Sequence, residues 1–286
     1  MAAEGALEQF GTRVLECGLS AASLGLGATV LVRALGGNEP LADWATGLGT
    51  IPSGTPMGIA LGAALLLMGG LLAARRLVPL ASGALALLTL VSLLRGGIDG
   101  LGSSLDCALL GGALSLVTLP AATVARLPRG LAALVDPHRP GPRQVVLRLG
   151  LALTLLLASW ELLTHPARYL DLLATTGGLG GWPLGGGRPL GPLLWVSTVQ
   201  LLLGALLVYG PPVRLASLLT ALLVGLELLL LHTPSALAAK AVGVVGAAIA
   251  SYCWASGVRQ LTDTSIGWLR ARESPPDPPT RRVERG

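Results

Sequence analysis

Charged side chains are scarce in this sequence of 286 residues. Only 12% of the residues are Asp, Glu, Lys or Arg, whereas a soluble domain carries about 25%. A soluble chain of this length could bury a large core, but its surface would still need charged residues. Because 52% of the residues are apolar, a lipid bilayer has to solvate much of the surface, and the composition argues against a soluble fold.

The motifs of several cofactor classes are also missing. The sequence has no Cys-x-x-Cys pair, no phosphate-binding Gly-Lys-Ser/Thr motif, no zinc-type histidine spacing and no paired histidines inside a helical segment for haem. The three cysteines, Cys17, Cys107 and Cys253, are isolated in apolar surroundings, which is typical of packing rather than of disulfide or redox chemistry. We therefore expect no metal site and no covalently bound cofactor.

The sequence is rich in continuous apolar segments. Each is close to the ~20 helical residues that cross the ~30 Å hydrocarbon layer of a bilayer. The clearest two are joined by the short turn 209–214, which predicts a transmembrane helical hairpin. We predict an all-α, polytopic membrane protein with eight transmembrane helices, preceded by a short polar lead, Met1–Thr12. The predicted segments are Val14–Val32, Pro56–Ala74, Leu77–Leu94, Leu105–Ala125, Val146–Leu163, Leu190–Val208, Leu215–Leu231 and Ala236–Trp254.

The basic residues predict an orientation. With eight crossings, fifteen arginines fall on the side of the two termini, whereas four arginines and Lys240 fall on the other side. Positive residues are retained in the cytoplasm, so both termini are predicted to be cytoplasmic. Nineteen arginines against a single lysine are typical of a GC-rich bacterial gene. The expected location is therefore the bacterial inner membrane.

The two halves of the chain look like copies. Arg13 and Arg148 each open a segment, Arg33 and Arg168 each close it, and both pairs are 135 residues apart. Four helices per copy would give both copies the same orientation in the membrane, related by a pseudo-twofold axis along its normal. The predicted parts are a first four-helix repeat (1–126), a basic cytoplasmic connector (127–145), a second four-helix repeat (146–255) and a cytoplasmic tail (256–286). In the tail we predict an interfacial helix followed by a disordered end.

The second half resembles the DoxX/DoxD-type membrane proteins. The resemblance rests on Arg148-Leu-Gly-Leu, on Gln200-Leu-Leu-Leu-Gly204, and on Gly210 followed by Arg214-Leu-Ala-Ser-Leu-Leu. It covers about residues 146–255 and, more faintly, 11–126. The resemblance implies a four-helix membrane bundle. It also implies a role as a subunit of a quinone-linked oxidoreductase, since some members, notably thiosulfate:quinone oxidoreductase, have that role.

Ionisable and polar groups inside the segments are the candidate functional residues, because charges are costly in a bilayer. Glu161, His165, Gln200, Glu227 and Lys240 are the candidates, and all but the mid-segment Gln200 fall near one predicted depth on the outward side. In the functional interpretation they line a polar pocket for a quinone headgroup, a proton or a small solute, with Glu227 paired to Lys240 and Glu161 to His165. In the structural interpretation the charges reach the interface or join helices, and Gln200 makes an interhelical hydrogen bond.

Three functions follow from these patterns. The first, which the resemblance favours, is a membrane subunit of a quinone-linked or other redox complex, with a redox partner subunit. The second is a small-solute or ion carrier, because parallel repeats can move against each other. The apparent lack of buried polar groups in the inner half of the segments counts against it. The third is a membrane scaffold that holds a partner protein through the basic connector and the tail. No nucleic-acid partner is expected.

Overall fold

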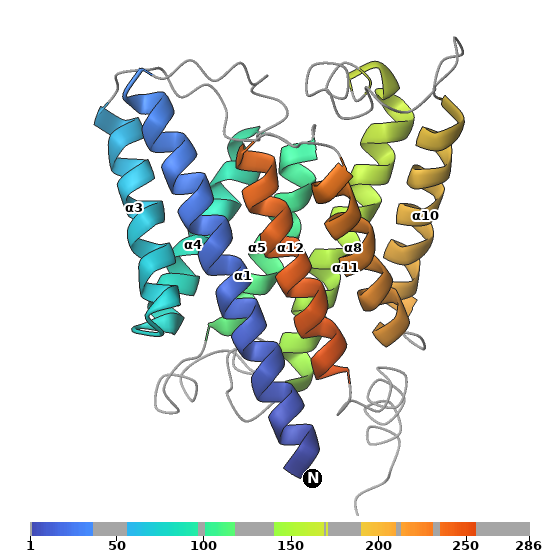
Figure 1. Cartoon of the computed structure of the whole chain (residues 1–286), viewed down its shortest axis with the longest axis horizontal. Coiled ribbons are helices and arrows are strands. Elements are labelled where there is room, and N and C mark those ends of the chain that lie inside the picture. The colour runs from blue at the N-terminus through green and yellow to red at the C-terminus, as the bar shows by residue number, and fades with distance from the viewer. Residues whose placement is uncertain are drawn as a thin grey trace, which may run out of the picture.

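The computed structural model describes residues 2–36, 56–96, 101–117, 140–168, 170, 190–209, 213–230 and 235–255. These residues form an all-helical bundle (Figure 1). Leu, Ala and Gly dominate the helices, and a helix satisfies its own backbone polar groups, as a segment in lipid must. The main helices are α1 (Ala2–Ala34), α3 (Pro56–Ala73), α4 (Val78–Gly96), α5 (Leu101–Leu116), α8 (Pro140–Thr164), α10 (Leu190–Tyr209), α11 (Val213–Leu230) and α12 (Ser235–Trp254).

Four of the helical stretches are long and apolar enough to cross a membrane: Ala6–Ala34, Pro56–Ala73, Arg143–Thr164 and Ala236–Trp254. Shorter apolar helices cover Val78–Leu94, Gly102–Leu116 and Leu193–Tyr209. Large apolar side chains stay exposed along the bundle, among them Leu87, Trp195 and Leu229. An apolar exterior of this extent fits a protein in contact with lipid. The prediction of a helical membrane protein is thus confirmed.

The centre of the bundle is formed by α5 and α12, which pack against each other. α12 also packs along α1 and α11, and α5 packs along α8 and α4. α3 lies outside α1, and α10 lies outside α8, so these two helices form the flanks in Figure 1.

Glycines allow the closest helix approaches. On α1 and α12, a Cβ added to Gly18 would lie 3.0 Å from the Cα of Gly246. On α5 and α8, a Cβ added to Gly111 would lie 3.0 Å from the Cα of Gly150. Small residues let backbones meet in this way in membrane bundles. The two contacts bring the central helices against α1 and α8.

Three predicted boundaries were wrong. The lead Met1–Thr12 was expected to be polar and non-helical, yet α1 begins at Ala2. The indole Nε1 of Trp254 donates a hydrogen bond to the carbonyl of Glu8 at 3.3 Å, and Gly11 lies against the same side chain. This contact gives the polar turns of α1 a tertiary partner. The connector was expected to reach residue 145, but α8 begins at Pro140, and α5 begins at Leu101 rather than Leu105.

Several predictions fall outside the described residues. These are the outward loops, the connector from 127 to 139, and the tail with its interfacial helix.

Candidate functional site

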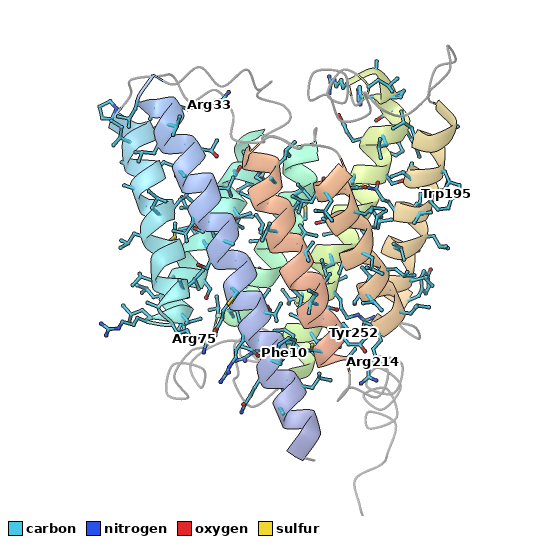
Figure 2. All side chains as sticks on the ribbon, in the orientation of Figure 1. Phe10, Arg33, Arg75, Trp195, Arg214 and Tyr252 are labelled. Atoms are coloured by element: carbon cyan, nitrogen blue, oxygen red, sulfur yellow. The ribbon has the colours of Figure 1, made fainter. Side chains whose placement is uncertain are left out.

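The labelled side chains in Figure 2 define two ends of the bundle. Arg33 lies at one end, called here the Arg33 end, and Arg75 and Arg214 lie at the opposite end, called the Arg214 end. Glu161 lies one turn before α8 ends, Glu227 one turn before α11 ends, and Lys240 shortly after α12 begins. Because successive helices alternate in direction, these three residues all lie toward the Arg33 end.

The first polar group is at the end of α8 and is called the α8 cluster. The buried carboxylate of Glu161 lies 3.4 Å from Nδ1 of His165 and 3.4 Å from Nη1 of Arg168. His165 and Arg168 are exposed, and Oγ1 of Thr164 lies 2.9 Å from Nδ1 of His165. The predicted contact between Glu161 and His165 is present, and Arg168 adds a second cation. The cluster therefore joins a buried acid to two groups that reach the surface.

The second group joins α10 to α11. Nε2 of Gln200 donates a hydrogen bond to Oε1 of Glu227 at 3.2 Å. Gln200 is buried, and its Oε1 has no hydrogen-bond partner among the described residues. The interhelical hydrogen bond predicted for Gln200 is therefore present, with one acceptor of its amide left over.

The third group corrects a predicted pairing. Lys240 does not pair with Glu227: its Nζ lies 2.7 Å from Oδ1 of Asp106 on α5 and donates to the carbonyl of Gly102 at 3.0 Å. Both charged side chains are buried, and Oγ of Ser92 lies 3.5 Å from Oδ2 of Asp106. Lys240 faces α5 because α12 packs against that helix in the centre of the bundle. The pair gives each buried charge its counter-ion.

Asp106 was missed as a candidate although the sequence held the signal. It lies inside an apolar segment, where any carboxylate is expensive and needs a partner. Its position next to the start of the predicted segment made it look like a boundary residue.

The five candidates do not form one pocket through direct contacts. Among the residues that the structure describes, no hydrogen bond or ion pair joins the α8 cluster, the Gln200–Glu227 pair and the Lys240–Asp106 pair to one another.

Serine and threonine hydroxyls fasten the helices that carry these groups. The hydroxyls of Ser159 on α8 and Ser197 on α10 lie 2.8 Å apart, and Ser159 also donates to the carbonyl of Ser197. Thr154 on α8 donates to the carbonyl of Ser104 on α5 at 2.8 Å. These bonds fix α8 relative to both neighbours and hold the α8 cluster in place.

Buried polar groups also occur toward the Arg214 end, contrary to the expectation from the sequence. Arg148 is buried and donates through Nη2 to the carbonyl of Leu207 at 2.8 Å, and Gln144 is buried one turn earlier on α8. The guanidinium satisfies a carbonyl in the last turn of α10, which the helix itself leaves unpaired. The inner part of the bundle is therefore not purely apolar.

No group of three or more His, Cys, Asp or Glu residues that could hold a metal ion occurs in the described part of the chain. His232, which was weighed as a boundary residue, lies outside it. No protein-family model, no curated protein and no solved structure matches the chain.

Proposed function

We propose that the chain crosses the membrane eight times as two like-facing repeats, α1–α3–α4–α5 and α8–α10–α11–α12. The packing supports this: α1 contacts α3 and α12, and α8 contacts α10 and α5, as a twofold exchange of the repeats requires. The pairs α4–α5 and α11–α12 correspond in the same way, and α5 meets α12 at the position of the proposed axis.

The glycine contacts set the register of these repeats. Gly246 lies 135 residues after Gly111, and their partners Gly18 and Gly150 are 132 residues apart. The contact of Leu24 with Gly69 is matched by that of Leu156 with Gly204, again with spacings of 132 and 135. The packing thus aligns α1 and α8 three residues away from the register suggested by the arginines, with Glu16 opposite Arg148.

We propose further that the protein is the membrane subunit of a quinone-linked redox complex, with a headgroup site at the α8 cluster. The observation that carries this proposal is the buried Glu161 carboxylate held between His165 and Arg168 at a helix end. Trp160, next in the chain, is 66% exposed on the apolar surface. A quinone needs both surroundings, because its headgroup is polar and its tail stays in lipid.

The residues present fit such a headgroup. Arg168 and His165 are exposed donors that can bind a carbonyl oxygen, and Arg168 keeps its charge at all relevant pH values. His165 can accept or release a proton near neutral pH, and Glu161 orients its ring through Nδ1. A bound quinone would supply two-electron, two-proton chemistry. The chain itself supplies hydrogen bonds and a route for protons to the surface.

The test is quinone-dependent electron transfer in native membranes, with co-purified proteins and extracted quinones identified in parallel. Glu161→Gln is expected to lower the activity by about a hundredfold, the scale of a lost acid–base group. Glu16→Gln is the matched control, since Glu16 pairs with Arg75 at 3.4 Å at the other end. Equal activity in both variants, or purification without quinone and without a redox partner, would contradict the proposal.

A carrier is less well supported. Alternating access would require the two repeats to move against each other, but the Lys240–Asp106 ion pair joins them through buried charges. Breaking such a pair leaves an uncompensated charge and is costly.

A further inference from the structure

Glu227 is a carboxyl group in apolar surroundings. It lies in α11 three residues before Leu230, with the exposed side chains of Leu226 and Leu229 beside it in the sequence. Among the described residues it makes no ion pair, and its hydrogen-bond partner is the amide of Gln200. A carboxylate without a cation is strongly disfavoured in such a place.

The surrounding helices do not supply a cation. α11 packs against α10 and α12, and α10 has no charged side chain. The single cation of α12, Lys240, is held by Asp106. The remaining titratable or charged side chains of these three helices lie at or near their opposite ends: Tyr209, Arg214, Tyr252 and Cys253.

Gln200 shows what is missing. Its Nε2 donates to Glu227, but its Oε1 is buried and unpartnered. An amide and a carboxylic acid can face each other through two parallel hydrogen bonds, N–H to the acid carbonyl and acid O–H to the amide oxygen. The first of these bonds is present. The second requires a proton on Glu227, which would satisfy the unpartnered oxygen.

We propose that Glu227 and Gln200 form a proton-binding site within the membrane-embedded surface, in which Glu227 carries the proton and Gln200 holds it. A metal ion fits less well. Hard cations such as Mg²⁺ and Ca²⁺ take about six or more oxygen ligands, and this pair offers one carboxylate and one amide oxygen. The site is independent of the quinone proposal, because it shares no hydrogen bond or ion pair with the α8 cluster among the described residues.

A lipid-soluble carbodiimide is a direct probe, since it modifies protonated carboxyl groups in apolar surroundings. The full chain in native membranes is treated with dicyclohexylcarbodiimide and analysed by peptide mass spectrometry. We expect Glu227 to be modified at neutral pH and the modification to fall as the pH rises. Asp106 is the internal control: it is equally an acid in a helix, but Lys240 holds it as a carboxylate, so it should stay unmodified.

Infrared difference spectroscopy gives a second readout that does not depend on access of the reagent. The wild-type protein should show a protonated-carboxyl C=O band that is absent in Glu227→Gln, a variant that keeps a hydrogen-bonding side chain beside Gln200. Gln200→Leu should shift this band, because the acid loses its partner. Absence of both the label and the band at Glu227 would overturn the proposal. Protection by sodium ions at constant pH would also overturn it and indicate a cation site instead.

Discussion

Lys240 Nζ lies 2.7 Å from Asp106 Oδ1, and the two residues come from α12 and α5, which meet in the centre of the bundle. Both side chains are almost completely buried. Lys240 also donates to Gly102, so two of its three N–H groups have partners. This ion pair is the main polar link between the N-terminal and C-terminal helices near the Arg33 end.

Removing one partner of this pair should be far worse than removing both. We expect Asp106→Asn to lower the free energy of unfolding by about 3–5 kcal/mol, because Lys240 stays buried without a counter-ion. The double variant Asp106→Leu/Lys240→Met should recover most of this loss, since it removes both desolvated charges. Unfolding in detergent, followed by circular dichroism, measures the difference. Wild-type stability of Asp106→Asn would show that the pair is not buried as described.

The glycine contacts predict a graded response to alanine. A Cβ on Gly150 would lie 2.7 Å from the carbonyl oxygen of Cys107 and 2.9 Å from the Cα of Gly111, so backbone would have to move. Gly150→Ala should therefore cost about 1–3 kcal/mol, the usual range for overpacking. Gly70 is the matched control on α3, because nothing lies within 4 Å of its added Cβ. Gly70→Ala should be neutral or slightly stabilising, and equal effects at both positions would contradict the α5–α8 contact.

The turn between α3 and α4 contains backbone strain that glycine should relieve. Leu77 has φ of 54° and is exposed, so its side chain contributes little packing in return for the left-handed conformation. Such a conformation costs a non-glycine residue roughly 1–2 kcal/mol. We expect Leu77→Gly to raise the free energy of unfolding by about 1 kcal/mol. Leu87→Gly, at an equally exposed position inside α4, should lower it by a similar amount.

The helices and their polar pairs differ in how far the sequence predicts them. Apolar runs long enough to cross a bilayer place most helices to within a few residues, because hydropathy depends on neighbours along the chain. Glu161 and His165 are one helical turn apart, so their contact also follows from local spacing. The partner of Lys240 does not. Hydropathy gives the depth of a residue in the membrane but not the direction it faces, and Asp106 is far away in the chain.

The start of α1 was wrong for a related reason. Its first turns are too polar for a membrane segment, so hydropathy stops the helix near Val14. The structure continues it to Ala2, with Trp254 and Glu8 in contact across helices that are more than two hundred residues apart in sequence. A tertiary contact of this kind leaves no periodic signal in either segment.

Membrane topology is the last prediction, and it tests the proposed repeats and the cytoplasmic termini together. Arg33 and Arg214 lie at opposite ends of the bundle (Figure 2). Single cysteines at these positions, in a chain whose three native cysteines are replaced, should differ in labelling by a membrane-impermeant maleimide. Arg33→Cys should react in intact spheroplasts, whereas Arg214→Cys should react only after lysis, because basic turns stay in the cytoplasm. The reverse pattern would invert the orientation, and labelling of both positions before lysis would contradict eight crossings.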